Sequence, residues 1–238
     1  TLDPRDAASL CEDLNAVYTP IFIRLGCVFS DLQDQKYFLI GVPPGINPVV
    51  AVSVWKWNGW VGIKDRNSYL GFAKPAGVPD RPIICADPAT IACAKLAINA
   101  TLSSRIAWAN DVAVRAKAFG ADPDVVCKIL GMDPRIGPAF LVPGWPPAGP
   151  CLPRDMDIWT SVPGQGMAEA VLVSHRITRQ RILAQIMEEL KAKPSETVLV
   201  IGLTYKPGGF DYTDALGLEV VRECVKSGYP VLAYDREG

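Results

Sequence analysis

Cys151 has the residue type and the setting for covalent chemistry. It lies in PGWPPAGPCLPRD, residues 143–155, four positions before Asp155. Pro153 suits the first turn of a helix, so the thiol would stand where a helix begins, and there the helix dipole and Arg154 favour the thiolate. Asp155 would follow one turn later on the same face, placed to orient or deprotonate a water. A loop cysteine packed under prolines, beside a solvated acid, accounts for the same residues.

Lys95 and Asn99 form a second candidate pair. They stand four residues apart in an alanine-rich run, so on a helix they share one face. A cation and an amide donor on that face would stabilise a developing oxyanion. The alternative is structural: a lysine whose stem lies along apolar surface, and an asparagine that bonds to a neighbouring carbonyl.

The helix that carries this pair is predicted over residues 87–119. Asp87 can cap its first turn, Pro88 fits the first helical position, and Gly120 is the expected stop. The many alanines along this run permit close contacts between helices. We expect a central α-helical region, residues 86–193, built around it.

Two more helices complete the central region. Residues 122–130 repeat the Asp-Pro start and are expected to end at Gly131, and residues 168–191 form a long amphipathic helix. Residues 194–238 then show a strand, a helix and a strand, which predicts two parallel strands at the start of a Rossmann-like α/β domain. Two strands alone do not make a stable sheet.

The N-terminal part, residues 1–85, is less regular. A short helix is predicted over residues 7–18, buried strands over 37–42 and 81–86, and a hairpin around Asn58-Gly59 within 53–63. The strand, GxGxxG turn and helix of a dinucleotide-binding domain do not occur here. Such a domain is therefore absent or only partly represented, and no cofactor-binding residue can be named.

Composition excludes several classes of function. The 238 residues are 49% hydrophobic with a net charge of −1, which argues against a nucleic-acid partner and a basic membrane patch. No uninterrupted apolar run is long enough to span a bilayer. The seven cysteines are scattered without a CxxC pair, so neither a metal site nor a disulfide framework is indicated, and a reducing, cytoplasmic location is expected.

Four motifs together resemble one enzyme family. KLAIN, MDPRIGPAFLVPG, GPCLPRD and VLVIGLTYKPG occur in the order and spacing typical of UDP-glucose/GDP-mannose dehydrogenases. The resemblance covers residues 85–238, about two thirds of the chain. It implies an NAD-dependent enzyme that oxidises the C6 hydroxyl of a nucleotide sugar twice, most like the enzymes that act on UDP-glucose. It also implies a homodimer or higher oligomer formed through the helix 87–119.

The resemblance assigns a role to each candidate residue. Cys151 corresponds to the nucleophile that forms a thiohemiacetal and then a thioester, while Lys95 and Asn99 stabilise oxygen charge and Asp155 manages protons and water. Substrate binding is assigned to five positions, with Arg135 reaching the site of the neighbouring subunit and Lys206 coming from the C-terminal domain; the five are Arg135, Phe140, Leu141, Gly149 and Lys206.

Four features depart from the family's pattern. Pro147 stands where an aromatic residue is usual and Ala148 replaces a glycine, which restricts the backbone before Cys151. Thr213-Asp214-Ala215 replaces an Arg-Glu-Ser run. The family's STVPPG turn survives only as GVPPG, and its Pro-Glu segment is missing.

Three alternatives to UDP-glucose oxidation stay open. GDP-mannose or a UDP-aminosugar could be the substrate. A single-step β-hydroxyacid dehydrogenase would need a lysine but no nucleophilic cysteine. A dimeric scaffold that binds a nucleotide sugar without turnover would account for the missing cofactor motif.

Overall fold

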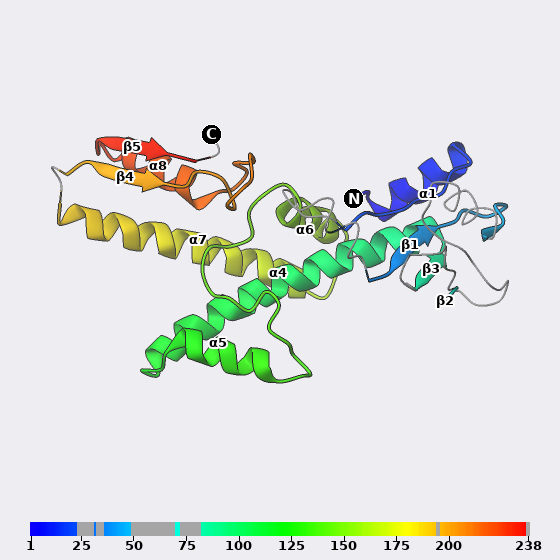
Figure 1. Ribbon diagram of the computed structural model, residues 1–238, viewed down its shortest axis with the longest axis horizontal. Coiled ribbons are helices and arrows are strands. Elements are labelled where there is room, and N and C mark those ends of the chain that lie inside the picture. Colours follow the sequence, from blue (N-terminus) through cyan, green and yellow to red (C-terminus); the bar gives the residue numbers. More distant parts are fainter. Residues whose placement is uncertain (23–30, 32–35, 49–69, 72–81, 194–195, 237–238) are drawn as a thin grey trace. The chain divides into compact units, whose positions relative to one another are not determined.

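A computed structural model describes residues 1–22, 31, 36–48, 70–71, 82–193 and 196–236. The chain forms two compact units, residues 1–97 and 98–238, and the division falls within one long helix. In chain order the elements are α1 (Pro4–Asp13), β1 (Phe38–Gly41), β2 (Leu70–Gly71), β3 (Ile83–Ala86), α4 (Pro88–Ala118), α5 (Pro123–Met132), α6 (Leu152–Thr160), α7 (Met167–Lys191), β4 (Val198–Ile201), α8 (Leu216–Lys226) and β5 (Val231–Tyr234) (Figure 1). The expected α/β class, with a long alanine-rich helix, is confirmed.

The first unit contains a small mixed sheet in the order β1-β3-β2. Strand β1 pairs in parallel with β3, and β2 pairs antiparallel on its other side. Side chains of β1 and β3 form a buried apolar cluster whose members include Phe38, Ile40 and Ile83. The strands predicted over 37–42 and 81–86 are confirmed, whereas the hairpin expected over 53–63 lies outside the described residues.

Helix α1 begins earlier than its apolar pattern indicated. It starts at Pro4 rather than near residue 7, because the carboxylate of Asp3 accepts a hydrogen bond from the Arg5 amide at 2.8 Å and caps the first turn. The helix ends at Asp13, so the predicted extension to residue 18 is wrong. Asp3-Pro4 is the same start signal as Asp87-Pro88 and Asp122-Pro123.

Helix α4 matches its predicted bounds within a residue at each end. Its alanines are the residues that let neighbours approach, and several of them are fully or almost fully buried: Ala92, Ala100, Ala107, Ala109, Ala113 and Ala116. Within the second unit, Ala100 and Ala107 pack with Met156 of α6 and Val171 of α7. This cluster fixes α6, and therefore the residues at its start, against α4 and α7.

Helix α5 does not stop at Gly131 as expected. It continues to Met132, and Gly131 is an interior helical residue. A Cβ at this position would lie 2.9 Å from the Cα of Pro138. The glycine is therefore explained by the close approach of the following loop rather than by a helix end.

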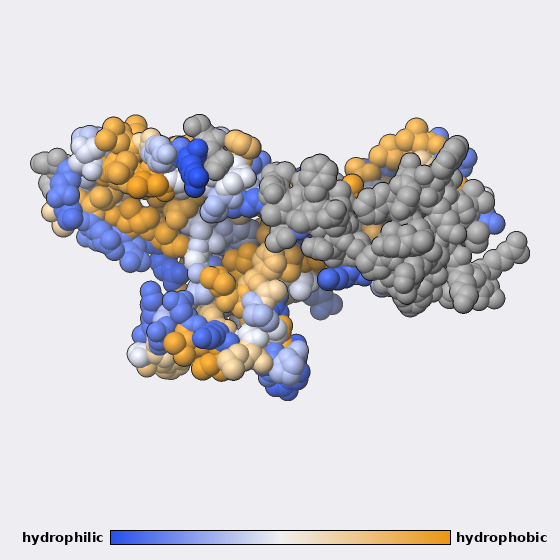
Figure 2. Space-filling view, in the orientation of Figure 1, coloured by the Kyte–Doolittle hydropathy of each residue, from blue (hydrophilic) through white to orange (hydrophobic). Residues whose placement is uncertain are grey.

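The C-terminal strands β4 and β5 form the predicted parallel pair, joined by α8. Apolar side chains of α7 and α8, among them Leu183 and Val220, pack with Val200 of β4. The other face of the pair exposes Leu199, Ile201, Leu232 and Tyr234, which register places opposite one another across the two strands. Hydrophobic residues gather in the same region in Figure 2.

Gly217 determines how closely α8 can approach the end of β4, because a Cβ there would lie 1.8 Å from the carbonyl oxygen of Gly202. We expect Gly217→Ala to lower the free energy of unfolding of the second unit by about 2 kcal/mol or more, measured by urea denaturation. Gly164→Ala is the matched control, since a Cβ at Gly164 would meet no atom within 4 Å. Equal stability of the two variants would contradict this account.

Candidate functional site

Cys151 is the N-cap residue of α6, at the junction of loop and helix that the sequence predicted. Its side chain is exposed and makes no capping hydrogen bond. Its carbonyl oxygen accepts a hydrogen bond from the amide of Asp155 at 2.9 Å, which closes the first turn of the helix. The thiol is therefore presented to solvent at the positive end of a helix, a setting suited to a nucleophile.

Asp155 is fully buried, so the alternative of a solvated acid is wrong. Its Oδ2 accepts a hydrogen bond from Nδ2 of Asn99 at 2.6 Å, and its Oδ1 accepts from Nε and Nη2 of Arg154 at 2.9 and 2.7 Å. Asn99 is itself 6% exposed. The two residues join α6 to α4 directly, and Asn99 bonds to a carboxylate rather than to the carbonyl that the structural alternative supposed.

Lys95 lies on α4 one turn before Asn99 but belongs to the first unit. Its Nζ is 4.3 Å from the centroid of the Phe22 ring, a cation–π contact. The expectation that Lys95 faces the sulfur of Cys151 stays a prediction, because the two residues belong to different units.

The loop before Cys151 is held at both ends. The Gly144 amide donates to Oδ1 of Asn110, on α4, and the Gly149 amide donates to the carbonyl of Thr213, each at 2.8 Å. Gly149 has φ +83°, and a Cβ on it would lie 2.7 Å from the Tyr205 ring. A residue without a side chain is required there for both reasons.

Lys206 lies near the same ring. Its Nζ is 5.5 Å from the centroid of Tyr205, and its carbonyl accepts a hydrogen bond from the Thr204 hydroxyl at 3.1 Å. Tyr205 thus contacts the residue after it and limits the space at Gly149. Two positions assigned to substrate binding are therefore close to one aromatic ring.

The remaining substrate candidates lie in the segment after α5. Arg135 pairs with Asp133 at 2.6 Å while 86% of its side chain is exposed. This pairing holds the pKa of Asp133 below its usual range. Phe140 is exposed with φ +60°, whereas Leu141 is buried against α4 and α5.

Arg105 of α4 organises this segment, and no sequence pattern singled it out. Its guanidinium donates to three backbone carbonyls of this loop, those of Ile136, Gly137 and Ala139, at 2.5 to 3.1 Å. Five fixed N–H donors suit arginine to this task. Arg135 and Phe140 therefore flank a loop that is bound to α4.

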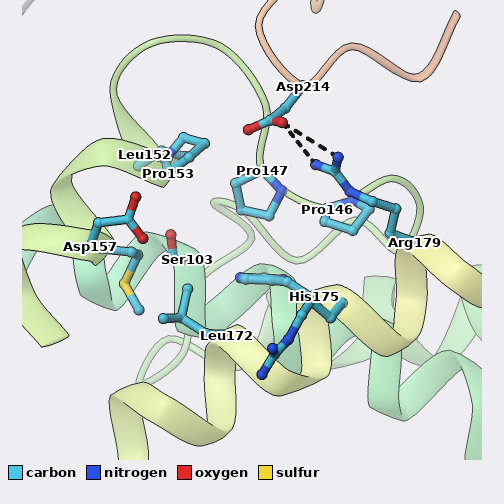
Figure 3. Close-up of a pocket in the computed structure, with 12 residues that line it drawn as sticks. Ser103, Pro146, Pro147, Leu152, Pro153, Asp157, Leu172, His175, Arg179 and Asp214 are labelled. Carbon is cyan, nitrogen blue, oxygen red and sulfur yellow. Dashed lines mark hydrogen bonds and ion pairs between the residues drawn. The ribbon is translucent and has the colours of Figure 1, made fainter. Parts of the chain in front are cut away.

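A cavity of about 460 Å³ lies behind the start of α6 (Figure 3). Leu152 and Pro153, which follow Cys151, line it together with Pro147 and Asp214, from two of the segments noted above as departures. The other lining residues had no role assigned from the sequence: Ser103, Pro146, Met156, Asp157, Leu172, His175, Arg176 and Arg179. The hydroxyl of Ser103 is buried and has no hydrogen-bond partner among the described residues. The only signal available was the spacing of His175 and Arg179, four apart on one helix face.

The pKa of His175 tests whether its side chain is buried in this cavity. Burial disfavours the imidazolium and Arg179 adds repulsion, so the pKa of His175 falls to about 4. The unfolded chain then binds more protons than the folded one, and stability present above about pH 6.5 is lost as the pH falls towards 4. We expect a loss of roughly 1–3 kcal/mol over that range. Because His175 is the only histidine, His175→Gln should flatten this dependence, and an unchanged urea-denaturation profile against pH would contradict the assignment.

The hydrogen bond between Asn99 and Asp155 can be tested by mutation. Asn99→Ala leaves one oxygen of a buried carboxylate without its donor and should cost about 1–3 kcal/mol of unfolding free energy. Asn99→Asp should cost more, because it places two carboxylates together. Trp159, which packs on the α4–α6–α7 cluster, is a fluorescent reporter. Arg115→Gln, which breaks an exposed pair with Asp111 on the same helix, is the control and should cost less than about 1 kcal/mol.

The described residues contain no group of three or more His, Cys, Asp or Glu side chains placed to hold a metal ion. None of the described helices has the length and apolar character needed to cross a bilayer.

Comparisons with known proteins agree with the motifs. Residues 89–174 match the model of the central domain of the UDP-glucose/GDP-mannose dehydrogenase family. A UDP-glucose 6-dehydrogenase of Haloferax volcanii is 31% identical over 228 residues, 94% of this chain and 49% of the relative. One from Bacillus subtilis is 29% identical over 159 residues, 65% of this chain and 34% of the relative.

A solved structure shows the same fold. The UDP-glucose dehydrogenase of Pyrobaculum islandicum superposes with a TM-score of 0.75 at 24% identity, covering 92% of this chain and 47% of that one. The chain thus spans a third to a half of the length of the relatives it matches. Its central region, residues 89–174, is therefore a central domain of the UDP-glucose/GDP-mannose dehydrogenase family.

Proposed function

We propose that this protein takes part in the two-step, NAD-dependent oxidation of a nucleotide sugar at C6, with UDP-glucose as the substrate. The observation that carries the proposal is the exposed Cys151 thiol at the start of α6, one turn from the buried Asn99–Asp155 pair. The names of the relatives support UDP-glucose. GDP-mannose and UDP-aminosugars stay as alternatives within the same chemistry.

Cys151 acts in this proposal as the nucleophile. Its thiolate adds to the C6 aldehyde carbon, a C–S bond forms, and the carbonyl electron pair moves onto oxygen. Asn99 stabilises that oxygen: its amide has two hydrogens, one of which is donated to Asp155. Lys95, from the same helix, supplies a cation to the oxygen.

Asp155 has a narrower role than a freely moving base. Both of its oxygens already accept hydrogen bonds, from Asn99 and Arg154. We propose that Asp155 fixes the orientation of the Asn99 amide and helps to orient the attacking water in the final step. In that step water adds to the thioester carbon, the C–S bond breaks, and the carboxylate and the Cys151 thiol are released.

Substrate contacts are proposed for Arg135 and Lys206, with Phe140, Leu141 and Gly149 in the loops beside the sugar nucleotide. The highly exposed side chain of Arg135 is consistent with its reaching a neighbouring subunit. We propose that this subunit is a second copy of the chain, bound through α4, whose Trp108 and Val114 are exposed.

The described residues do not fit the pyrophosphate of NAD. Helix α4 directly follows strand β3, but its first turn is capped by the Asp87 carboxylate, which accepts from the Thr90 amide at 2.9 Å and would repel a phosphate. The turn after β1, residues 42–46, lacks the glycine pattern of a dinucleotide site. We therefore assign the thiol chemistry and the sugar contacts to the described residues, and no step of the cofactor's chemistry.

This misfit favours a second candidate, a dimeric scaffold that binds a nucleotide sugar without turnover. The same Asp87 cap supports it, together with the prolines that restrict the loop before Cys151. The two candidates differ in one property, which is whether the thiol reacts.

Cys151→Ser separates them. With the full-length protein, UDP-glucose and NAD, we expect about two NADH per uronate formed, and roughly a hundredfold or greater loss of uronate formation in the variant. The Kd for UDP-glucose, measured by calorimetry, should change less than about twofold, since serine preserves the shape of the side chain. A wild-type protein that binds UDP-glucose but forms no NADH would establish the scaffold, and a ratio near one would contradict the double oxidation.

A further inference from the structure

Two of the segments that depart from the family's pattern contact each other: the loop before Cys151 and residues 213–215. The indole Nε1 of Trp145 donates to the carbonyl of Asp214, and the amide of Gly149 donates to the carbonyl of Thr213, both at 2.8 Å. The loop before Cys151 is thereby bound to the segment that precedes α8. Changes in the two segments are physically coupled, and neither can be interpreted alone.

Arg179 of α7 lies against both segments. Its guanidinium is 3.3 Å from Oδ1 of Asp214, 3.4 Å from Oε1 of Glu219, and 5.2 Å from the centroid of the Trp145 ring. Figure 3 shows Arg179 and Asp214 facing each other beside Pro146 and Pro147. Arg179 therefore contacts Asp214, just before α8, and Glu219, in its first turn. It also lies over the Trp145 ring of the loop before Cys151.

These contacts are placed where they can control the loop. Pro146, Pro147 and Pro150 have no N–H, so few donors are available to hold residues 145–150. Asp214 has φ +56°, a left-handed conformation that is uncommon for residues other than glycine. Arg179 and its two acids each expose between 25 and 36% of their side chains, so solvent screens their attraction only in part.

We propose that Arg179 is a positioning residue for Cys151. Held between Asp214, Glu219 and Trp145, it fixes the 145–150 loop against the start of α8, and thereby fixes the thiol at the N-terminus of α6. The inference rests on the proposed function only for the role of the thiol. The hydrogen bonds and the accessibility of the thiol can be measured without turnover.

Arg179→Gln removes the charge, Arg179→Lys restores it without the planar stack, and Lys191→Gln is the matched control, a charge lost from an exposed pair on the same helix. We expect hydrogen exchange in residues 145–151 to accelerate roughly tenfold or more in Arg179→Gln. Arg179→Lys should restore part of the protection. Lys191→Gln should leave these residues, and the α4 amides, as in the wild type.

Alkylation by iodoacetamide gives an independent readout, resolved for each cysteine by peptide mass spectrometry. At neutral pH the rate at Cys151 should fall about threefold or more in Arg179→Gln, because a loosened thiol loses its fixed place at the helix N-terminus. Cys93, also exposed but in the first unit, is the internal control. Arg179→Lys should recover part of the rate at Cys151.

Unchanged exchange at 145–151 in Arg179→Gln would overturn the proposal, and so would faster exchange throughout α7 and α8, since that is a general loss of stability. If Arg179→Gln does not fold, Asp214→Asn replaces it: this variant removes a charge that pairs with Arg179 and keeps the backbone carbonyl that accepts from Trp145, and the same local loss is expected. If Cys151→Ser retains uronate formation while Arg179→Gln still loosens the loop, the proposed function fails and the positioning role stands.

Discussion

The hydrogen bond between Asn99 and Asp155 is the interaction on which the candidate site depends. It is buried, charge-assisted and 2.6 Å long, and it joins α4 to α6 through two residues that are 56 positions apart in sequence. Burial of the carboxylate is tolerated because both oxygens have donors. Since Asp155 is one turn from Cys151, the same bond that stabilises the packing of α6 on α4 determines where the thiol stands.

Around that bond, the site is built from short loops tied to rigid helices. Arg105 and Asn110 on α4 bind the backbone of the two loops that contain Arg135, Phe140 and Gly149. Arg179 on α7 binds the other side of the loop before Cys151. Polar side chains on the helices hold these loops in place. The residues on the loops therefore keep their positions although they contribute little to the apolar core.

Two of the segments that depart from the family's pattern are connected in the structure. Trp145 and Gly149 lie in the loop before Cys151, and Thr213 and Asp214 lie in the segment before α8, yet two hydrogen bonds connect the two segments. A change of loop sequence is compatible with an ordered loop when its new donors find acceptors in a segment that has changed with it. These hydrogen bonds affect the position of the Cys151 thiol, and they do not change the family's fold.

Local sequence patterns predicted most of the helices and strands, and the starts of several of them. Asp-Pro pairs began α4 and α5, the β-α-β period predicted parallel strands, and Pro153 placed Cys151 at a helix N-terminus, because capping and periodicity are local effects. Gly131 was misjudged, since its reason is contact with Pro138, not a helix end. The hydrogen bond of Asn99 with Asp155 and the contact of Arg179 with Trp145 follow from the three-dimensional packing. Those partners meet through the packing of distant helices, and no local pattern in the sequence specifies it.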